Sequence, residues 1–69
     1  MKHVPVDSSH IKSVAHDPEE NVMHVTFKNG AAYAYHGVTA ETHKAMMESP
    51  SVGTFHASHI RGKYKETKL

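Results

Sequence analysis

Two tyrosines separated by a single residue, Tyr33 and Tyr35, have the type and spacing that favour a binding function. In an extended segment, side chains two residues apart point to the same face, so the two rings would form one aromatic surface. Bases of single-stranded nucleic acid stack on such rings, while nearby Lys and Arg side chains contact the phosphates. The structural alternative is that both tyrosines cover the sheet beside their cross-strand neighbours, with their hydroxyls in water.

Basic residues are concentrated at the end of the chain. The net charge is only +1, but Arg61, Lys63, Lys65 and Lys68 are four of the eight Lys and Arg residues and lie within the last nine positions. A basic segment of this kind is a common footprint for polyanions. It is also typical of an ordinary solvated helix C-terminus, where cations interact favourably with the helix dipole.

One hairpin must position the tyrosines. Asn29 and Gly30 separate two runs of alternating β-branched and aromatic residues, which favours a two-residue type I′ turn. This turn would place Thr26 opposite Tyr33 and His24 opposite Tyr35. One face of the hairpin would then be a core, made of Met23, Val25, Phe27, Ala32 and Ala34. The opposite, solvent-facing side would carry His24, Thr26, Tyr33 and Tyr35.

A further strand is predicted over residues 10–16, before a turn at residues 17–21. A five-residue loop there would place His16 opposite Val22 and Ile11 opposite Phe27. Ile11 and Ala15 would join the core, while Lys12, Val14 and His16 would join the tyrosine face. The predicted nucleic-acid contacts are therefore Lys12, His16, His24, Tyr33, Tyr35, Arg61 and Lys63.

Two short helices follow the strands. Thr39 has the chemistry of an N-cap for a helix over residues 40–48, and Ser51 for a second helix that reaches about Tyr64. The chain should fray from Lys65 onward. The sequence thus predicts one α+β domain over residues 1–69, a three-stranded antiparallel meander followed by two helices packed on one face (βββαα).

Other residues with chemically active side chains form weaker patterns. Ser51, Gly53 and Thr54 would open the second helix, where free backbone N–H groups can hold an anion, although Gly53 is equally suited to close helix packing. His56 and His59 have an i,i+3 spacing, but no Cys and no convincing further ligands accompany them, so solvated histidines are favoured over a metal site. A serine such as Ser8, Ser9 or Ser51 could be combined with a His and Asp17, but no nucleophile-elbow or paired-carboxylate pattern supports this, and we expect neither enzymatic activity nor a cofactor.

The length and composition limit the class of protein. A domain of 69 residues has little room for an enclosed pocket. The absence of Cys suits a reducing compartment, and no stretch resembles a secretory signal or a membrane span. We therefore expect a cytoplasmic protein with no membrane partner.

Several short patterns, in this order, resemble the KTSC domain family. They are Ser9-x-Ile11, the strand ending in His16-Asp17, Val25-x-Phe27-x-x-Gly30, Tyr33-Ala34-Tyr35 leading to Val38, Ser51-x-Gly53-x-Phe55, and Ile60-Arg61. The resemblance covers about residues 8–64. This family is named for its occurrence at the C-terminus of some lysyl-tRNA synthetases, and it also occurs as small stand-alone proteins of bacteria and phages. Attachment to a synthetase suggests RNA binding. Of the predicted contacts, only Tyr33 and Tyr35 match the family's central motif, and His16 stands where many members have Tyr.

The sequence therefore predicts a small non-enzymatic module that binds RNA or other single-stranded nucleic acid through the tyrosine face and the basic segment. The alternative is a protein-interaction module that uses the same face, or an exposed strand edge to which a partner strand is added. The salt dependence of oligonucleotide binding distinguishes the two, because phosphate contacts weaken steeply as salt rises.

Overall fold

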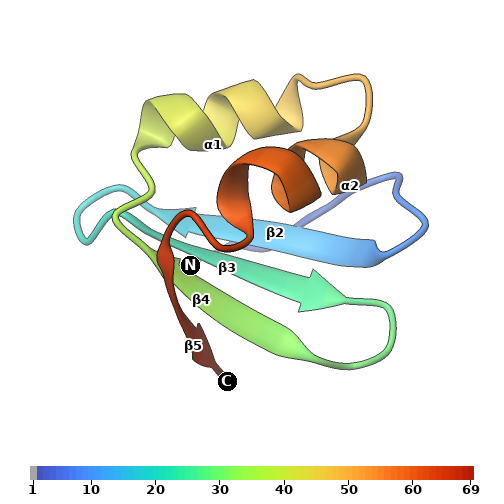
Figure 1. Ribbon diagram of the computed structural model, residues 1–69, viewed down its shortest axis with the longest axis horizontal. Coiled ribbons are helices and arrows are strands. Elements are labelled where there is room, and N and C mark those ends of the chain that lie inside the picture. Colours follow the sequence, from blue (N-terminus) through green and yellow to red (C-terminus); the bar gives the residue numbers. More distant parts are fainter. Residues whose placement is uncertain (1) are drawn as a thin grey trace.

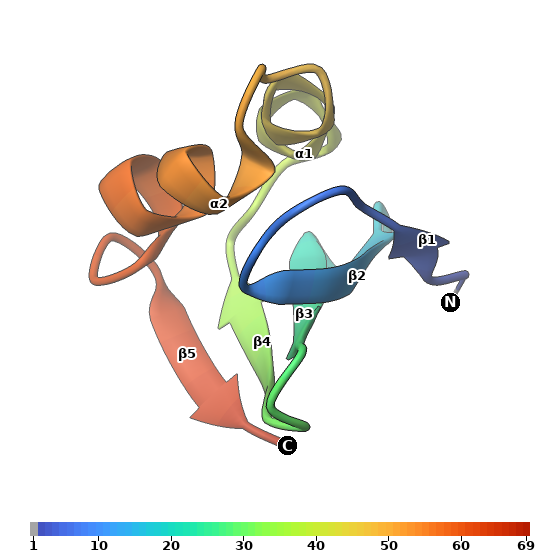
Figure 2. The ribbon, with the colours of Figure 1, turned by 90° about the vertical axis from the view of Figure 1, so that its right-hand side faces the viewer.

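The computed structural model describes residues 2–69, which form one antiparallel sheet with its helices on a single face (Figure 1). The sheet order follows the chain, β1-β2-β3-β4-β5. The elements are β1 (Val4–Pro5), β2 (Ile11–Asp17), β3 (Val22–Phe27), β4 (Ala32–His36), α1 (Ala40–Met47), α2 (Val52–Phe55), the π-helical turn η1 (His56–Ile60) and β5 (Lys65–Lys68). Figure 2 shows both helices on one side of the sheet, with β1 and β5 at its two edges.

The α+β class, the central meander and the two helices on one face are confirmed. The sheet has five strands rather than three, because short strands add to each edge. The last residues were expected to fray, but β5 pairs with β4 along Tyr33–Lys68 to His36–Lys65. The second helix ends at Ile60, earlier than the predicted Tyr64. No helix within residues 2–69 is long and apolar enough to cross a membrane.

The hairpin between β3 and β4 has a three-residue loop, not the predicted two-residue turn. The backbone N–H of Gly30 donates to Phe27 O at 3.0 Å, and the N–H of Phe27 donates to Ala31 O at 2.8 Å. Gly30 has a φ of 94°, whereas among residues 2–69 the only non-glycine residue with positive φ is Asn21. Asn29 is therefore not left-handed, and the loop is a type I turn followed by a left-handed glycine.

This extra loop residue shifts the register by one and reverses the faces of β4. Tyr35 pairs with Met23 and Tyr33 with Val25, while Ala34 pairs with His24. Tyr35 is only 2% exposed and belongs to the core under the helices. The prediction that Tyr33 and Tyr35 form an open face is therefore wrong.

The predicted register of β2 is right at one end of the strand and wrong at the other. Ile11 pairs with Phe27 as predicted, but an irregularity between Ile11 and Ser13 shifts the remaining pairs by one. His16 consequently lies opposite Met23 on the helix-covered side, with Val14 two residues before it. The bulge allows Ile11 and Val14, which are three residues apart, to be buried in the same core.

Both predicted helix caps are confirmed. The side-chain oxygen of Thr39 accepts a hydrogen bond from Thr42 N, and that of Ser51 accepts one from Thr54 N. After the single turn of α2, the chain continues as a π-helical turn closed by a bond from Arg61 N to His56 O. Its wider turn keeps the helix's buried residues four apart. These residues are Val52, His56 and Ile60.

Candidate functional site

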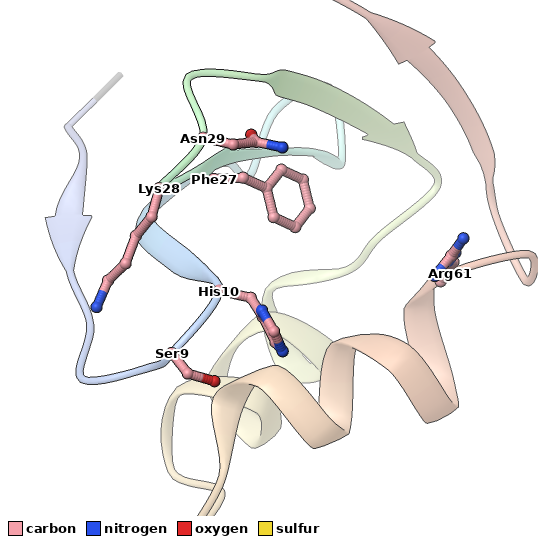
Figure 3. Close-up of a pocket in the computed structure, with 6 residues that line it drawn as sticks. All are labelled: Ser9, His10, Phe27, Lys28, Asn29 and Arg61. Carbon is pink, nitrogen blue, oxygen red and sulfur yellow. The ribbon is translucent and has the colours of Figure 1, made fainter.

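A cleft of about 570 Å³ lies between the helical segment α2–η1 and the β3–β4 hairpin (Figure 3). Its volume lies within the range of small-ligand sites, roughly 300–1,000 Å³. Three segments contribute its walls: the loop before β2, the end of β3 with the hairpin loop, and the residue that follows η1. The lining residues are Ser9, His10, Phe27, Lys28, Asn29 and Arg61.

The lining of this cleft is basic and rich in hydrogen-bond donors. It contains Lys28, Arg61 and His10 and no acidic side chain. In Figure 3 Arg61 lies across the cleft from Phe27, whereas the ammonium of Lys28 points away from the ring of Phe27. On the same side of the sheet β5 adds one cation and one anion, because Lys68 pairs with Tyr33 and Glu66 pairs with Tyr35. The cations of the lining itself favour an anionic ligand, with Arg61 as the side chain best placed to bind it.

The floor of the cleft is a fixed aromatic ring. Phe27 meets Tyr33 edge to face at a centroid distance of 5.9 Å, and meets His56 in the same manner at 5.4 Å. Phe27 and Tyr33 are both partly exposed and pack against the core. The ring of Phe27 is thus held between two neighbours at the floor of the cleft.

Beneath the cleft, a buried hydrogen bond joins the imidazole of His56 to the hydroxyl of Tyr35 at 2.8 Å. Burial lowers the pKa of His56, Arg61 lowers it further, and Glu66 opposes the change. Burial, followed by the charge of Glu66, raises the pKa of Tyr35 to about 12. Both groups are therefore neutral near pH 7, and they support the floor of the cleft from below.

The structure scatters several of the residues predicted to bind nucleic acid. His16 lies under α1, where its Nε2 donates to Val38 O at 2.7 Å and its ring stacks on His43 at 4.9 Å. Its assignment to the open face is wrong, because the bulge in β2 turns it toward the helices. His24 does lie on the open face, between Ala15 and Ala34 of the neighbouring strands.

The exposed cations among the predicted contacts do not form one group. Lys12 is exposed in β2 at the bulge, and Arg61 and Lys63 are exposed after η1. Of these three, Arg61 alone lines the cleft. The predicted surface is therefore not formed, and the candidate site is the cleft on the helix-covered side of the sheet.

The predicted anion site at the start of the second helix is already internally bonded. The Ser51 hydroxyl accepts from Thr54 N at 3.3 Å and donates to the Thr54 hydroxyl at 3.0 Å. A Cβ added at Gly53 would come within 3.0 Å of the Ser8 hydroxyl, so close packing accounts for this glycine. These three residues line a second hollow of about 380 Å³ beside the loop before β2.

Sequence reasoning did not assign Ser9, His10, Phe27, Lys28 and Asn29 to a site. Phe27 was placed in the core, and it does pack there, but it is the last residue of β3 and so also faces the cleft. The one signal for the others was their position in two turn-forming segments that meet at the same end of the sheet. Within residues 2–69 no cluster of three or more His, Asp or Glu side chains could hold a metal ion.

The KTSC domain family matches residues 7–64. The chain belongs to the KTSC domain family. The crystal structure of a KTSC domain protein from Yersinia pestis superposes with a TM-score of 0.92 at 33% identity, over 99% of this chain and 96% of that one.

Two further relatives of this KTSC domain come from other bacteria. An uncharacterised protein of Stutzerimonas stutzeri is 40% identical over 53 residues, which cover 77% of this chain and 75% of the relative. A protein of Tsukamurella paurometabola is 29% identical over 65 residues, which cover 94% and 97% of the two chains. The KTSC fold therefore spans nearly the whole of this chain.

Proposed function

We propose that this KTSC domain is a non-enzymatic module that binds RNA or other single-stranded nucleic acid, and that the cleft is its contact surface. The observation that carries the proposal is the partly exposed ring of Phe27 on one side of the cleft and Arg61 on the other, in a lining that has no carboxylate. An unpaired base would stack on Phe27, and the neighbouring phosphate would bind Arg61. This site replaces the tyrosine face as the proposed surface.

The physical contributions are of the kind that single-strand binding uses. Stacking of one base on an aromatic side chain contributes about 1–3 kcal/mol. The planar guanidinium of Arg61 offers a two-pronged donor to phosphate oxygens. Lys28 adds positive potential without contacting the same group. Bases in a duplex are paired and stacked inside it, so a single strand suits this cleft better.

A protein partner that adds a strand to the sheet edge is less favoured by the two edge strands. β1 has only two residues, one of them Pro5, and β5 has the sequence Lys-Glu-Thr-Lys with every residue exposed. Short edges, proline and charged side chains are the features by which natural sheets discourage pairing with another chain. The nucleic-acid proposal therefore has the stronger support.

Fluorescence anisotropy with short labelled RNA and single-stranded DNA tests the proposal. We expect affinity to fall as salt is raised from about 20 to 200 mM, with a slope of about −0.7 for each phosphate contact. Arg61→Ala should reduce the slope by about one contact, whereas Phe27→Leu should weaken binding at all salt concentrations without changing the slope. Lys44→Ala, which removes an exposed charge from α1, is the matched control.

Two results would contradict this proposal. One is the absence of an anisotropy change at the lowest salt concentration, with the protein in large excess. The other is an equal loss of affinity in Arg61→Ala and Lys44→Ala, because that pattern would reflect net charge rather than the cleft.

A further inference from the structure

We infer that the cleft is a pocket for one nucleotide, and that it binds a free nucleoside 5′-monophosphate with the base on Phe27 and the phosphate on Arg61. This inference rests on the assignment, under the proposed function, of the cleft as the nucleic-acid contact. It goes further by naming the unit that the site accepts.

The first argument concerns how many bases the cleft can stack. Phe27 is the only aromatic hydrocarbon ring among its six lining residues. Tyr33 supports that ring from the side but does not itself line the cleft. A site that follows a strand over several nucleotides needs successive aromatic platforms. One platform beside one guanidinium is matched instead to one base and one phosphate.

The second argument is that the walls are tied to one another before any ligand arrives. The backbone N–H of Lys28 donates to His10 O at 2.9 Å, which joins the hairpin to the loop before β2. That loop is also held by Ser8, whose hydroxyl accepts from the N–H groups of His10 and Ile11 at 3.2 Å each.

On the opposite wall, Arg61 is fixed to the helix that carries His56. The backbone N–H of Arg61 donates to His56 O at 2.8 Å, and the His56 ring packs against Phe27. The main chain that carries the guanidinium and the aromatic ring are thus connected through one residue. A preformed frame lowers the cost of ordering the site, which matters most for a small ligand with few contacts.

The third argument is the set of polar groups around the ring. The side-chain oxygen of Asn29 accepts from Ala31 N at 3.0 Å, so its amide N–H groups remain as donors. The hydroxyl of Ser9 and the imidazole of His10 lie on the facing wall. Groups of this kind can bind the edge of a base or a ribose hydroxyl while Arg61 holds the phosphate.

NMR titration of the backbone amides with adenosine and uridine 5′-monophosphates tests the inference, with adenosine and inorganic phosphate as half-ligand controls. We expect saturable shifts at Phe27, Asn29 and Arg61. Each half-ligand should bind at least about tenfold more weakly, as expected when a charge-assisted contact or a stacked base is missing.

Two variants and one control sharpen the test. Arg61→Lys keeps the charge but loses the planar fork, and should weaken the monophosphates while leaving adenosine unchanged. Phe27→Leu should weaken the monophosphates and adenosine while leaving inorganic phosphate unchanged. Lys44→Ala should bind every probe as the parent protein does.

The outcomes separate this inference from the proposed function. Oligonucleotides that bind at the cleft when monophosphates do not would overturn the one-nucleotide pocket and leave strand binding standing. Monophosphates that bind when oligonucleotides do not would support the pocket and overturn strand binding. Shifts of equal size with inorganic phosphate alone would overturn the pocket, because the base would then contribute nothing.

Discussion

The hydroxyl of Tyr35 and Nε2 of His56 lie 2.8 Å apart, and this buried hydrogen bond joins β4 to the turn η1. Tyr35 is 2% exposed and His56 is 6% exposed. Their rings also meet edge to face at a centroid distance of 5.2 Å. Each residue supplies the polar partner that the other needs in order to be buried. The second tyrosine of the Tyr-x-Tyr motif is therefore part of the core.

Removal of the Tyr35 hydroxyl should destabilise the domain. We expect Tyr35→Phe to lower the free energy of unfolding by about 1–3 kcal/mol, because His56 loses its buried partner. Tyr35→Ala should cost more, about 3–5 kcal/mol. Tyr33→Phe is the control, since Tyr33 is only partly buried and its hydroxyl can reach water. Urea unfolding measures all three, and equal losses in the two Phe variants would argue against the buried bond.

Acid should destabilise the fold through the half-buried His43 and the buried His56. Burial lowers the pKa of both His43 and His56, and the neighbouring charges of His16 and Arg61 respectively lower it further. The unfolded chain then binds more protons than the folded chain below the ordinary His value of about 6.5. The free energy of unfolding should therefore decrease as the pH falls from about 7 toward 5.

One substitution isolates the contribution of His43. Its Nε2 is buried without a hydrogen-bond partner. Burial of the protonated ring would therefore cost more free energy than burial of the neutral ring. His43→Phe keeps a ring to stack on His16 and removes the titrating group. Thermal unfolding between about pH 7 and 5 should show a shallower loss of stability in this variant. A loss as steep as in the parent protein would mean that other groups dominate.

Alkali should weaken the fold through Tyr35. Its pKa is raised to about 12 in the folded state, against about 10 in an unfolded chain. The folded chain therefore keeps a proton that the unfolded chain loses, and stability should fall as the pH rises from about 10 to 12. The loss attributable to this residue is at most about 3 kcal/mol. It should be absent in Tyr35→Phe, and phenolate absorbance should show one tyrosine ionising last.

The features predicted correctly from the sequence depend on local chemistry. Thr39 and Ser51 cap helices because their hydroxyls accept from a backbone N–H three residues later. The hairpin position at Gly30 was also predicted correctly. Ile11 pairs with Phe27 as predicted, but through a loop of residues 18–21 and an irregularity in β2 rather than through the predicted five-residue loop. For the caps and the hairpin position, the residues that decide the structure lie close together in the chain.

The features predicted wrongly depend on residues far apart. Asn29 and Gly30 suit a two-residue or a three-residue loop, and the two loops place opposite faces of β4 in the core. Tyr35 can be buried only because His56, 21 residues later, supplies a partner for its hydroxyl. The sequence of β5, Lys-Glu-Thr-Lys, contains no apolar residue, and all four residues are exposed. An alternating apolar pattern therefore could not identify it as a strand. The cleft depends on the same long-range packing.

Two substitutions in the hairpin loop test the register on which the cleft depends. Gly30 has a φ of 94°, so Gly30→Ala should cost about 1–2 kcal/mol. In the observed loop Asn29 is not left-handed, and Asn29→Ala should lose only the hydrogen bond to Ala31 N, about 1 kcal/mol or less at this exposed position. In a two-residue type I′ turn both residues would need positive φ, and the alanine variants would then be similarly destabilised. Urea unfolding of the pair distinguishes these cases: comparable losses would indicate the other register, which would carry Tyr35 to the open face and remove the floor of the cleft.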